Sequence, residues 1–432
     1  MIDNDLSLEA PSLNANLTGL KPSATVASQE RSNRLLAEGR QIFRMGLGQS
    51  PFPVPDSVVA ALKENAHQKD YLPVKGLTAL RETLAARHTR LFNEPCHADR
   101  VLIGPGSKEL MFILQLVFEG DVLIPSPAWV SYAPQARIIG RRVVSIATSA
   151  EDQWRLTPQQ LDAVCREDPR RRRLLILNYP SNPTGGSYSR EDLEALALAC
   201  RRHGVIVLSD EIYSRLRFEG EHQSMVPLYP EGTIYSSGLS KWCGAGGWRL
   251  GTFIFPDQLS WIADAMAIVA SETFTSTSAP IQCAAVRAFE DGPEIEQYLA
   301  DSQQILGQLA RYSHSSLEDN GLSTVRPLGG FYCFPDFEVA RDALAARGIL
   351  HSAELTEQLL EDTGVAILPG VEFGRPATEL TARIAYVDFD GSEALAALAA
   401  NERKTPDTAF LRAHCGNTIE AIDRIVQWVK AL

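Results

Sequence analysis

Seven short apolar runs between residues 101 and 255 place the strongest limit on what this chain can fold into. They cover residues 101–104, 122–125, 142–147, 174–178, 205–209, 233–237 and 251–255, and amphipathic stretches separate them. Strands that alternate with helices are typical of a mostly parallel sheet with helices on both faces. The sequence therefore predicts an α/β fold.

Helix start signals lie between these runs. Thr157 and Gln160 are spaced for a capping box around Pro158, which suits the first helical position. Ser189 opens the next helix in a similar way. Apolar residues at helical spacing also run through residues 417–432, and we expect that helix to pack on a core.

The length of the chain allows two domains. With 432 residues and 45% apolar content, the chain can bury a large core. The turn-rich stretch 326–330 is a candidate boundary. We expect a large domain over residues 57–325, and a small domain made from residues 1–56 together with 326–432. Residues 1–40 show no readable motif, and we expect either a mobile tail or an arm that packs on a neighbouring subunit.

Charge and composition exclude several classes of partner. A net charge of −12 argues against nucleic acid or an anionic membrane, although residues 170–173 form a run of four arginines. This run precedes a predicted strand, so we expect a solvated loop, with anion binding as the alternative.

Seven cysteines without a CxxC pair form no metal-ligand cluster or disulfide framework, and we expect no metal. The chain shows no secretory signal and no long apolar run, so we expect a cytoplasmic protein.

One lysine stands in a stretch of small residues, 236–251. Lys241 has glycine, alanine and serine around it, and Arg249 follows eight residues later. A lysine that holds pyridoxal phosphate needs room for a ring beside its amine, and an arginine can donate two hydrogen bonds to the phosphate. The alternative is a surface loop with one solvated lysine. This stretch alone does not separate the two interpretations.

Four further motifs accompany the lysine segment in chain order. They read Tyr-Leu-Pro-Val-Lys-Gly at 71–76, Asn-Tyr-Pro-Ser-Asn-Pro-Thr-Gly at 178–185, Asp-Glu-Ile-Tyr at 210–213 and Arg-Ile-Ala-Tyr at 383–386. From about residue 46 to about residue 390, the chain resembles the class I/II aminotransferases, which are fold-type I enzymes that use pyridoxal phosphate. The resemblance implies a large domain with a mostly parallel sheet and a smaller α+β domain.

The resemblance also implies how the cofactor ring is held. Lys241 matches the lysine that forms the internal aldimine and then acts as the general base. Asp210 matches the carboxylate beside the ring nitrogen, where it stabilises the positive charge. Asn182 and Tyr213 match the residues that hydrogen-bond the phenolic oxygen of the ring. A common Asn-Pro turn is the alternative for Asn182, and a core tyrosine is the alternative for Tyr213. Trp129 matches the aromatic residue that stacks on the ring, with core packing as its alternative.

A phosphate site follows from the segment 104–110. This glycine-containing link from a strand to a helix resembles the family's phosphate loop, with Gly106, Ser107 and Lys108 in contact with the cofactor. It lacks the order of a nucleotide-binding loop. Arg249 matches the phosphate-binding arginine.

The phosphate site departs from the family at one position. Many relatives carry a serine three residues before the lysine, where this chain has Gly238. Ser237 or Ser240 would then compensate. Tyr71 matches a tyrosine that crosses the interface of a homodimer to the phosphate of the partner, so the resemblance implies shared active sites.

Substrate contacts are implied at three positions. Arg383 matches the arginine that clamps the α-carboxylate, and the backbone of Gly48 and the side chain of Asn182 would also face the substrate. An exposed arginine on a strand is the alternative for Arg383. Some relatives read a distal carboxylate with a second arginine, and no motif in this sequence locates one.

The resemblance leaves three classes of function open. The first is an aminotransferase that exchanges an amino group between an L-amino acid and a 2-oxo acid. The second is a lyase, cyclase or oxidase of secondary metabolism with the same cofactor, because the electron sink is common to all of them. The third is a non-catalytic protein on the same fold, which the intact lysine, aspartate and arginine argue against.

Overall fold

The computed structural model describes residues 14–20 and 22–432, and its centre is a seven-stranded sheet. The strand order is β2-β8-β7-β6-β5-β3-β4, and β8 runs antiparallel to both of its neighbours while the other pairs are parallel. The strands are β2 Val101–Gly104, β3 Asp121–Ser126, β4 Val143–Ala147, β5 Arg173–Asn178, β6 Ile206–Asp210, β7 Thr233–Gly238 and β8 Gly251–Ile254. All seven predicted strands are therefore confirmed, with boundaries that differ by one residue at most.

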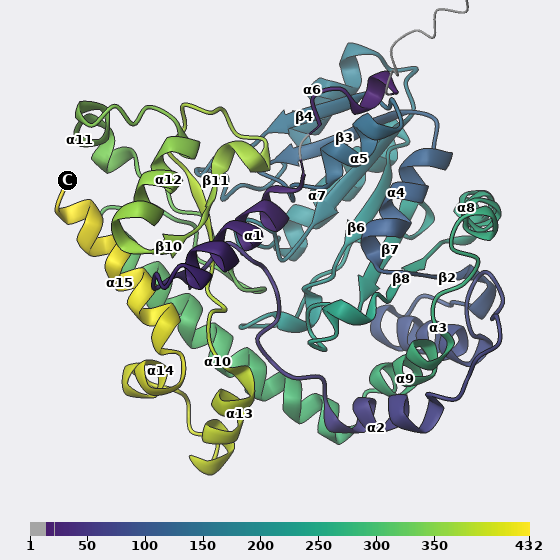
Figure 1. Cartoon of the computed structure of the whole chain (residues 1–432). Coiled ribbons are helices and arrows are strands. Elements are labelled where there is room, and N and C mark those ends of the chain that lie inside the picture. Colours follow the sequence, from purple (N-terminus) through teal and green to yellow (C-terminus); the bar gives the residue numbers. More distant parts are fainter. Residues whose placement is uncertain (1–13, 21) are drawn as a thin grey trace, which may run out of the picture.

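Both faces of this sheet are covered by helices (Figure 1). In β5, Leu174 and Ile176 pack in the layer that contains α4, α5 and α8, while Leu175 and Leu177 pack in the layer of α6 and α7. This alternation follows from the period of two along a strand. The helices are α2 Asp56–Asn65, α3 Thr78–Phe92, α4 Ser107–Val117, α5 Tyr132–Ile138, α6 Pro158–Glu167, α7 Arg190–His203, α8 Ser260–Glu272 and α9 Ala279–Phe289.

The predicted caps of two of these helices are confirmed. Thr157 accepts a hydrogen bond from the backbone of Gln160, and the Gln160 side chain accepts one from the Thr157 backbone. Ser189 and Asp192 form the same reciprocal pair at the start of α7. Each cap satisfies backbone amides that the first helical turn leaves free, and is worth about 1 kcal/mol.

The four-arginine run enters a strand, as expected, and residues 170–172 are exposed, but the last arginine is buried rather than solvated. Arg173 begins β5, is buried, and donates to the backbone carbonyls of Val164, Cys165 and Asp168 near the end of α6. Arg171 pairs with Asp121 at the start of β3. Hydrogen bonds and ion pairs inside the chain therefore engage both arginines.

The C-terminal part and residues 24–44 pack together beside the large sheet (Figure 1). Strands β11, β12 and β9 form one small sheet, and β1 pairs with β10 in another. The long helix α10 lies against α15, whose buried face includes Ile422 and Ile425, so the predicted terminal helix is confirmed. The elements are β1 Phe43–Arg44, β9 Tyr332–Cys333, β10 Val365–Ala366, β11 Leu368–Pro369, β12 Ala382–Ala385, α10 Pro293–Glu318, α11 Arg341–Ala346, α12 Ser352–Thr363, α13 Gly391–Ala400, α14 Thr408–His414 and α15 Gly416–Lys430.

Helix α1, Ala24–Ala37, changes the expectation for the start of the chain. Residues 1–13 lie outside the described residues, whereas most of residues 22–40 form a helix, and the expected packing on a neighbouring subunit stays a prediction. Leu35 packs in a small cluster with Ile42 and Leu360, and Arg31 pairs with Glu361 of α12. The helix therefore packs on its own chain. The division into residues 57–325 and residues 1–56 with 326–432 stays a prediction.

Candidate active site

A cavity of about 350 Å³ opens at the carboxyl ends of β5, β6 and β7, where ligands bind in open parallel sheets. Eleven of the thirteen residues predicted for the site line this cavity. They are Gly48, Ser107, Lys108, Trp129, Asn182, Asp210, Tyr213, Ser240, Lys241, Arg249 and Arg383. Residues that are about 335 positions apart in the sequence thus meet in one cavity.

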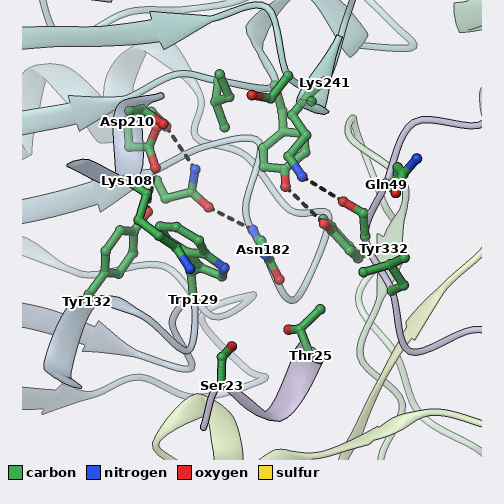
Figure 2. Close-up of a pocket in the computed structure, with 18 of the residues that line it drawn as sticks. Ser23, Thr25, Gln49, Lys108, Trp129, Tyr132, Asn182, Asp210, Lys241 and Tyr332 are labelled. Carbon is green, nitrogen blue, oxygen red and sulfur yellow. Dashed lines mark hydrogen bonds between the residues drawn. The ribbon is translucent and has the colours of Figure 1, made fainter. Parts of the chain in front are cut away.

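Pairing between β5, β6 and β7 brings together the segments that carry Asn182, Asp210 and Lys241. Asn178 at the end of β5 pairs in register with Asp210, and Asp210 pairs with Ser236 of β7. The Asn178 amide donates to the Asp210 carbonyl at 2.9 Å, and its oxygen accepts from the Asn182 backbone at 2.8 Å (Figure 2). The loop that carries Asn182 is therefore held against the strand that carries Asp210.

Asp210 is a buried carboxylate with a tyrosine as its partner. The Tyr132 hydroxyl donates to the Asp210 carboxylate at 2.5 Å. Burial raises the pKa of Asp210 to about 6, although the bonds from Tyr132 and the Ile212 amide favour the charged form. A cationic ring nitrogen beside this carboxylate would restore its charge by Coulombic attraction.

Lys241 is held in the cavity by a backbone carbonyl. Its amine donates to the Gly48 carbonyl at 2.6 Å (Figure 2). Burial and the nearby Arg383 guanidinium together lower the pKa of Lys241 to about 8, although Asp210 acts in the opposite direction. An amine with such a pKa is partly neutral near pH 7.5, which a nucleophile or general base requires.

The loop before α4 forms a cradle for an anion. Gly106 has a φ of +92°, a conformation that is strained for a residue with a Cβ atom, and the Arg249 guanidinium lies where that Cβ atom would be. The α4 N-terminus lacks a side-chain cap, which leaves backbone amides free to donate. Gly106 itself does not line the cavity, but it contacts Arg249, which does.

Close packing explains why Gly238 stands where many relatives carry a serine. A Cβ atom at Gly238 would come within 2.7 Å of the Leu250 carbonyl on the neighbouring strand segment. Ser240 lines the cavity, whereas Ser237 lies against a different group of residues that includes Tyr235. Ser240 is therefore the better of the two candidates to replace the missing hydroxyl.

Arg383 lies on the opposite side of the cavity, on β12. It is 1% exposed, so the alternative of an exposed arginine is wrong. Its guanidinium donates to the Asn182 side chain at 3.0 Å and to the Gly46 carbonyl at 2.5 Å. Its Nε has no hydrogen-bond partner among the described residues, which is costly for a buried donor and leaves it available to a carboxylate.

The aromatic residues surround these charged groups. Trp129 lines the cavity and packs edge to face with Tyr132, and the Lys108 amine lies 5.0 Å from the centre of the Trp129 ring. The Tyr213 hydroxyl lies 2.9 Å from the Tyr332 hydroxyl. Burial raises the pKa of Tyr213 well above its usual value, so its hydroxyl keeps its proton.

Several cavity residues had no predicted role. Tyr132 follows Trp129 by three residues in the same link, so its position in the sequence offered a signal. Tyr332 follows a turn and begins a very short strand, and no sequence pattern marks it. Ser23 and Thr25 lie at the start of α1, across the cavity from Lys241 in Figure 2. No group of three or more metal-ligating side chains occurs in the part of the chain that the structure describes.

Tyr71 lies apart from these residues. It is 89% exposed and does not line the cavity of its own chain. This placement leaves its predicted role, which needs a second chain, open to experiment.

Comparisons with known proteins agree with this geometry. The profile of the family described as aminotransferase class I and II matches residues 40–397. Aspartate aminotransferase of Geobacillus stearothermophilus is 34% identical over 370 residues, which are 83% of this chain and 91% of that protein. Asparagine–oxo-acid transaminase of Streptococcus mutans is 30% identical over 380 residues, which are 84% of this chain and 92% of that protein.

A solved structure shows the same architecture. Aspartate aminotransferase of Thermus thermophilus with maleate superposes with a TM-score of 0.82 and 27% identity, covering 97% of this chain and all of that one. Family profile, relatives and fold all extend over most of the chain, and they coincide with a cavity that contains a buried lysine, aspartate and arginine. The chain belongs to the class I and II aminotransferases.

Proposed function

We propose that this aminotransferase takes its amino group from an amino acid with a second carboxylate, with aspartate as the first candidate. Its enzyme class is that of its family, which uses pyridoxal phosphate to exchange an amino group between an amino acid and a 2-oxo acid. The observation that carries the substrate proposal is a fourth basic side chain, Lys108, in the cavity that also contains Lys241, Arg249 and Arg383.

The cavity suits pyridoxal phosphate. The Gly106 cradle, the free amides of α4 and Arg249 would hold the phosphate, and Ser240 would add a hydroxyl. Asp210 would face the ring nitrogen. When bound, the cofactor supplies an electron sink for the electrons released as the α-proton leaves.

Residues of the chain would carry out proton transfer and orient the substrate. Lys241 would take the α-proton and return it to the neighbouring carbon, because its lowered pKa leaves a useful fraction of neutral amine. Arg383 would hold the α-carboxylate with its free Nε, and so fix the orientation of the α-proton. Tyr213 and Asn182 would donate to the phenolic oxygen of the ring.

Lys108 and the start of α1 support a substrate with an acidic side chain. The backbone amide of Lys108 is close to the phosphate cradle, but its amine lies above the Trp129 ring and lines the cavity. The Ser23 side chain makes no capping bond at the start of α1, so the hydroxyls and free amides there can also donate. The relatives named above act on aspartate and asparagine, and the Thermus enzyme was solved with maleate.

A substrate comparison tests this proposal. We expect kcat/KM to be at least about 100-fold higher for aspartate than for alanine with the same 2-oxo acid acceptor, because a buried charge pair is worth a few kcal/mol. Lys108→Gln should lower kcat/KM for aspartate by about 10- to 100-fold and barely change it for alanine. Lys63→Gln on the exposed side of α2 is the matched control.

The result separates the two substrates that the relatives suggest. A wild-type preference for asparagine over aspartate would contradict an acidic substrate. Equal losses for aspartate and alanine in Lys108→Gln would place the amine with the cofactor instead, and cofactor affinity measured in the same variant would confirm this.

We also propose that two chains form a homodimer in which Tyr71 reaches the phosphate site of the partner. The exposure of Tyr71 and its absence from the lining of its own cavity support this role. A cytoplasmic location stays a prediction. No helix among residues 14–20 and 22–432 is long and apolar enough to cross a membrane.

A further inference from the structure

Tyr332 lines the cavity from the small sheet, in β9, where it is 1% exposed. It pairs in register with Ala385 of β12, the strand that carries Arg383. Its hydroxyl lies 2.9 Å from the Tyr213 hydroxyl, and the two rings meet edge to face at 5.6 Å (Figure 2). Both rings are buried, so each is fixed by its surroundings.

The same side chain contacts two other groups of the cavity. The Arg383 guanidinium lies 4.7 Å from the centre of the Tyr332 ring. A Cβ atom at Gly48 would come within 1.8 Å of the Tyr332 hydroxyl, so the bare Cα of Gly48 packs directly on it. The Gly48 carbonyl in turn accepts the bond from Lys241. Tyr332 therefore touches the predicted clamp, the substrate-facing backbone and the predicted cofactor contact.

We propose that Tyr332 is a positioning residue, whose hydroxyl orients and polarises Tyr213 toward the phenolic oxygen of the cofactor while its ring holds Arg383 in place. The proposal rests on the assignment of Tyr213 to that oxygen. It concerns two separable parts of one side chain, the hydroxyl and the ring.

Hydrogen-bond direction explains the effect of the hydroxyl. A tyrosine hydroxyl has one proton to donate. When Tyr213 donates to the cofactor, its oxygen can accept from Tyr332, so the bonds run from Tyr332 to Tyr213 to the phenolic oxygen. Donors in such a chain strengthen one another. A stronger donor favours the deprotonated form of the group that accepts, and so lowers its pKa.

The ring acts separately on the arginine. Arg383 is buried, and burial lowers its pKa from the usual value. The faces of the Tyr332 and Phe373 rings, 4.7 and 5.0 Å from the guanidinium, partly compensate for the lost water. Removing the Tyr332 ring should therefore loosen the clamp, whereas removing only the hydroxyl should not.

A pH titration of the absorption band of the bound cofactor, without substrate, tests the hydroxyl. We expect Tyr213→Phe to raise the pKa of the cofactor by about 1 unit or more, and Tyr332→Phe to raise it by roughly 0.5 unit. The double variant should match Tyr213→Phe, because the Tyr332 hydroxyl acts through Tyr213. Tyr386→Phe is the matched control, since Tyr386 is fully buried nearby and its hydroxyl has no partner among the described residues.

Kinetics test the ring. Tyr332→Phe should lower kcat about 3- to 10-fold with KM for the amino acid near that of the wild type, and Tyr332→Leu should also raise KM about tenfold. The absorption band itself reports that each variant folds and binds the cofactor.

Four results would overturn the proposal. An unchanged cofactor pKa in Tyr332→Phe would mean that the hydroxyl only packs, and an equal shift in Tyr386→Phe would mean that the change is not specific. A shift in the double variant equal to the sum of both single shifts would show that Tyr332 does not act through Tyr213. If Tyr213→Phe alone causes no shift, the assignment of Tyr213 is wrong and the proposal falls with it, while transamination by the wild type would still support the function.

Discussion

The two sides of the cavity are built in different ways. On the sheet side, Asp210 ends β6 and Asn182 follows the end of β5 by four residues. The large sheet and its covering helices supply the partner of the Asp210 carboxylate and hold the Asn182 backbone, while the Asn182 side chain accepts from Arg383 across the cavity. On the opposite side, Arg383 and Tyr332 come from a four-residue and a two-residue strand, and Ser23 from a helix end. Arg383 Nε and the Ser23 side chain keep free hydrogen-bonding capacity there.

From this difference we infer that one side of the cavity holds the cofactor and the other binds the substrate. Groups whose partners are already in place suit a cofactor that stays bound, because their geometry is fixed before it arrives. Groups with free donors on short elements suit a substrate that enters and leaves. We therefore expect changes on the sheet side to affect the chemistry, and changes on the opposite side to affect substrate binding, except at the Tyr332 hydroxyl, which acts on the cofactor through Tyr213.

The largest effect should follow from Lys241→Ala. Loss of the amine removes both the cofactor link and the base, so turnover should fall by at least about 10⁴-fold while circular dichroism stays unchanged. Borohydride reduction of the wild type should fix the cofactor to Lys241, as shown by mass mapping. Lys63→Ala should retain full activity, and a label on another lysine would contradict the assignment.

Mixing two inactive variants tests whether a second chain completes the cavity. Tyr71→Glu should repel the phosphate of the partner and be inactive, as Lys241→Ala is. After dissociation and reassembly together, random exchange should restore about a quarter of wild-type activity, because half of the dimers contain one intact site.

The control for that mixture is Lys241→Ala with Arg249→Glu. Both changes lie in the same half-site, so every site in a mixed dimer keeps one of them and the mixture should stay inactive. With subunit exchange confirmed, failure of the Tyr71 mixture to recover would show that Tyr71 does not act across the interface.

Arg383→Lys tests the opposite side. A lysine cannot present the forked donors that a carboxylate needs, so kcat/KM for the amino acid should fall about 100-fold, mainly through KM. The absorption band and affinity of the cofactor should change little. Loss of the cofactor with an unchanged KM would contradict the division between the two sides.

The smallest effect should be on the pH dependence of cofactor capture, in which Arg383 on one side of the cavity influences Lys241 on the other. Cofactor capture by the apoenzyme needs neutral Lys241, whose pKa is lowered to about 8, so the rate should fall roughly tenfold per pH unit below 8 and level off above it. Arg383→Leu removes a nearby positive charge and should move this midpoint upward. A free alkylamine, titrated in parallel, should show no plateau near 8. An unmoved midpoint in Arg383→Leu would show that the charge of Arg383 does not reach Lys241.

Sequence reasoning succeeded where the pattern is local. A strand buried on both faces is a run of apolar residues, and a capping box is set by four consecutive positions, so the sheet and the starts of α6 and α7 could be predicted from the residues alone. Lys241, Asp210 and Arg383 were found through motifs of a known family. Their burial and their partners could not be predicted, because these depend on which strands become neighbours.

Tyr332 and helix α1 show what the sequence by itself left open. Nothing in residues 22–40 indicates that α1 packs on α12 with its first residues at the cavity, because that position depends on contacts with residues more than 300 positions away. Tyr332 meets Tyr213 across 119 residues through the pairing of very short strands. The sequence determined the α/β sheet, the family and the chemical groups of the site, because each leaves a local pattern. The tertiary structure decided which groups are buried, paired or free to bind, because these properties arise only when distant segments pack together.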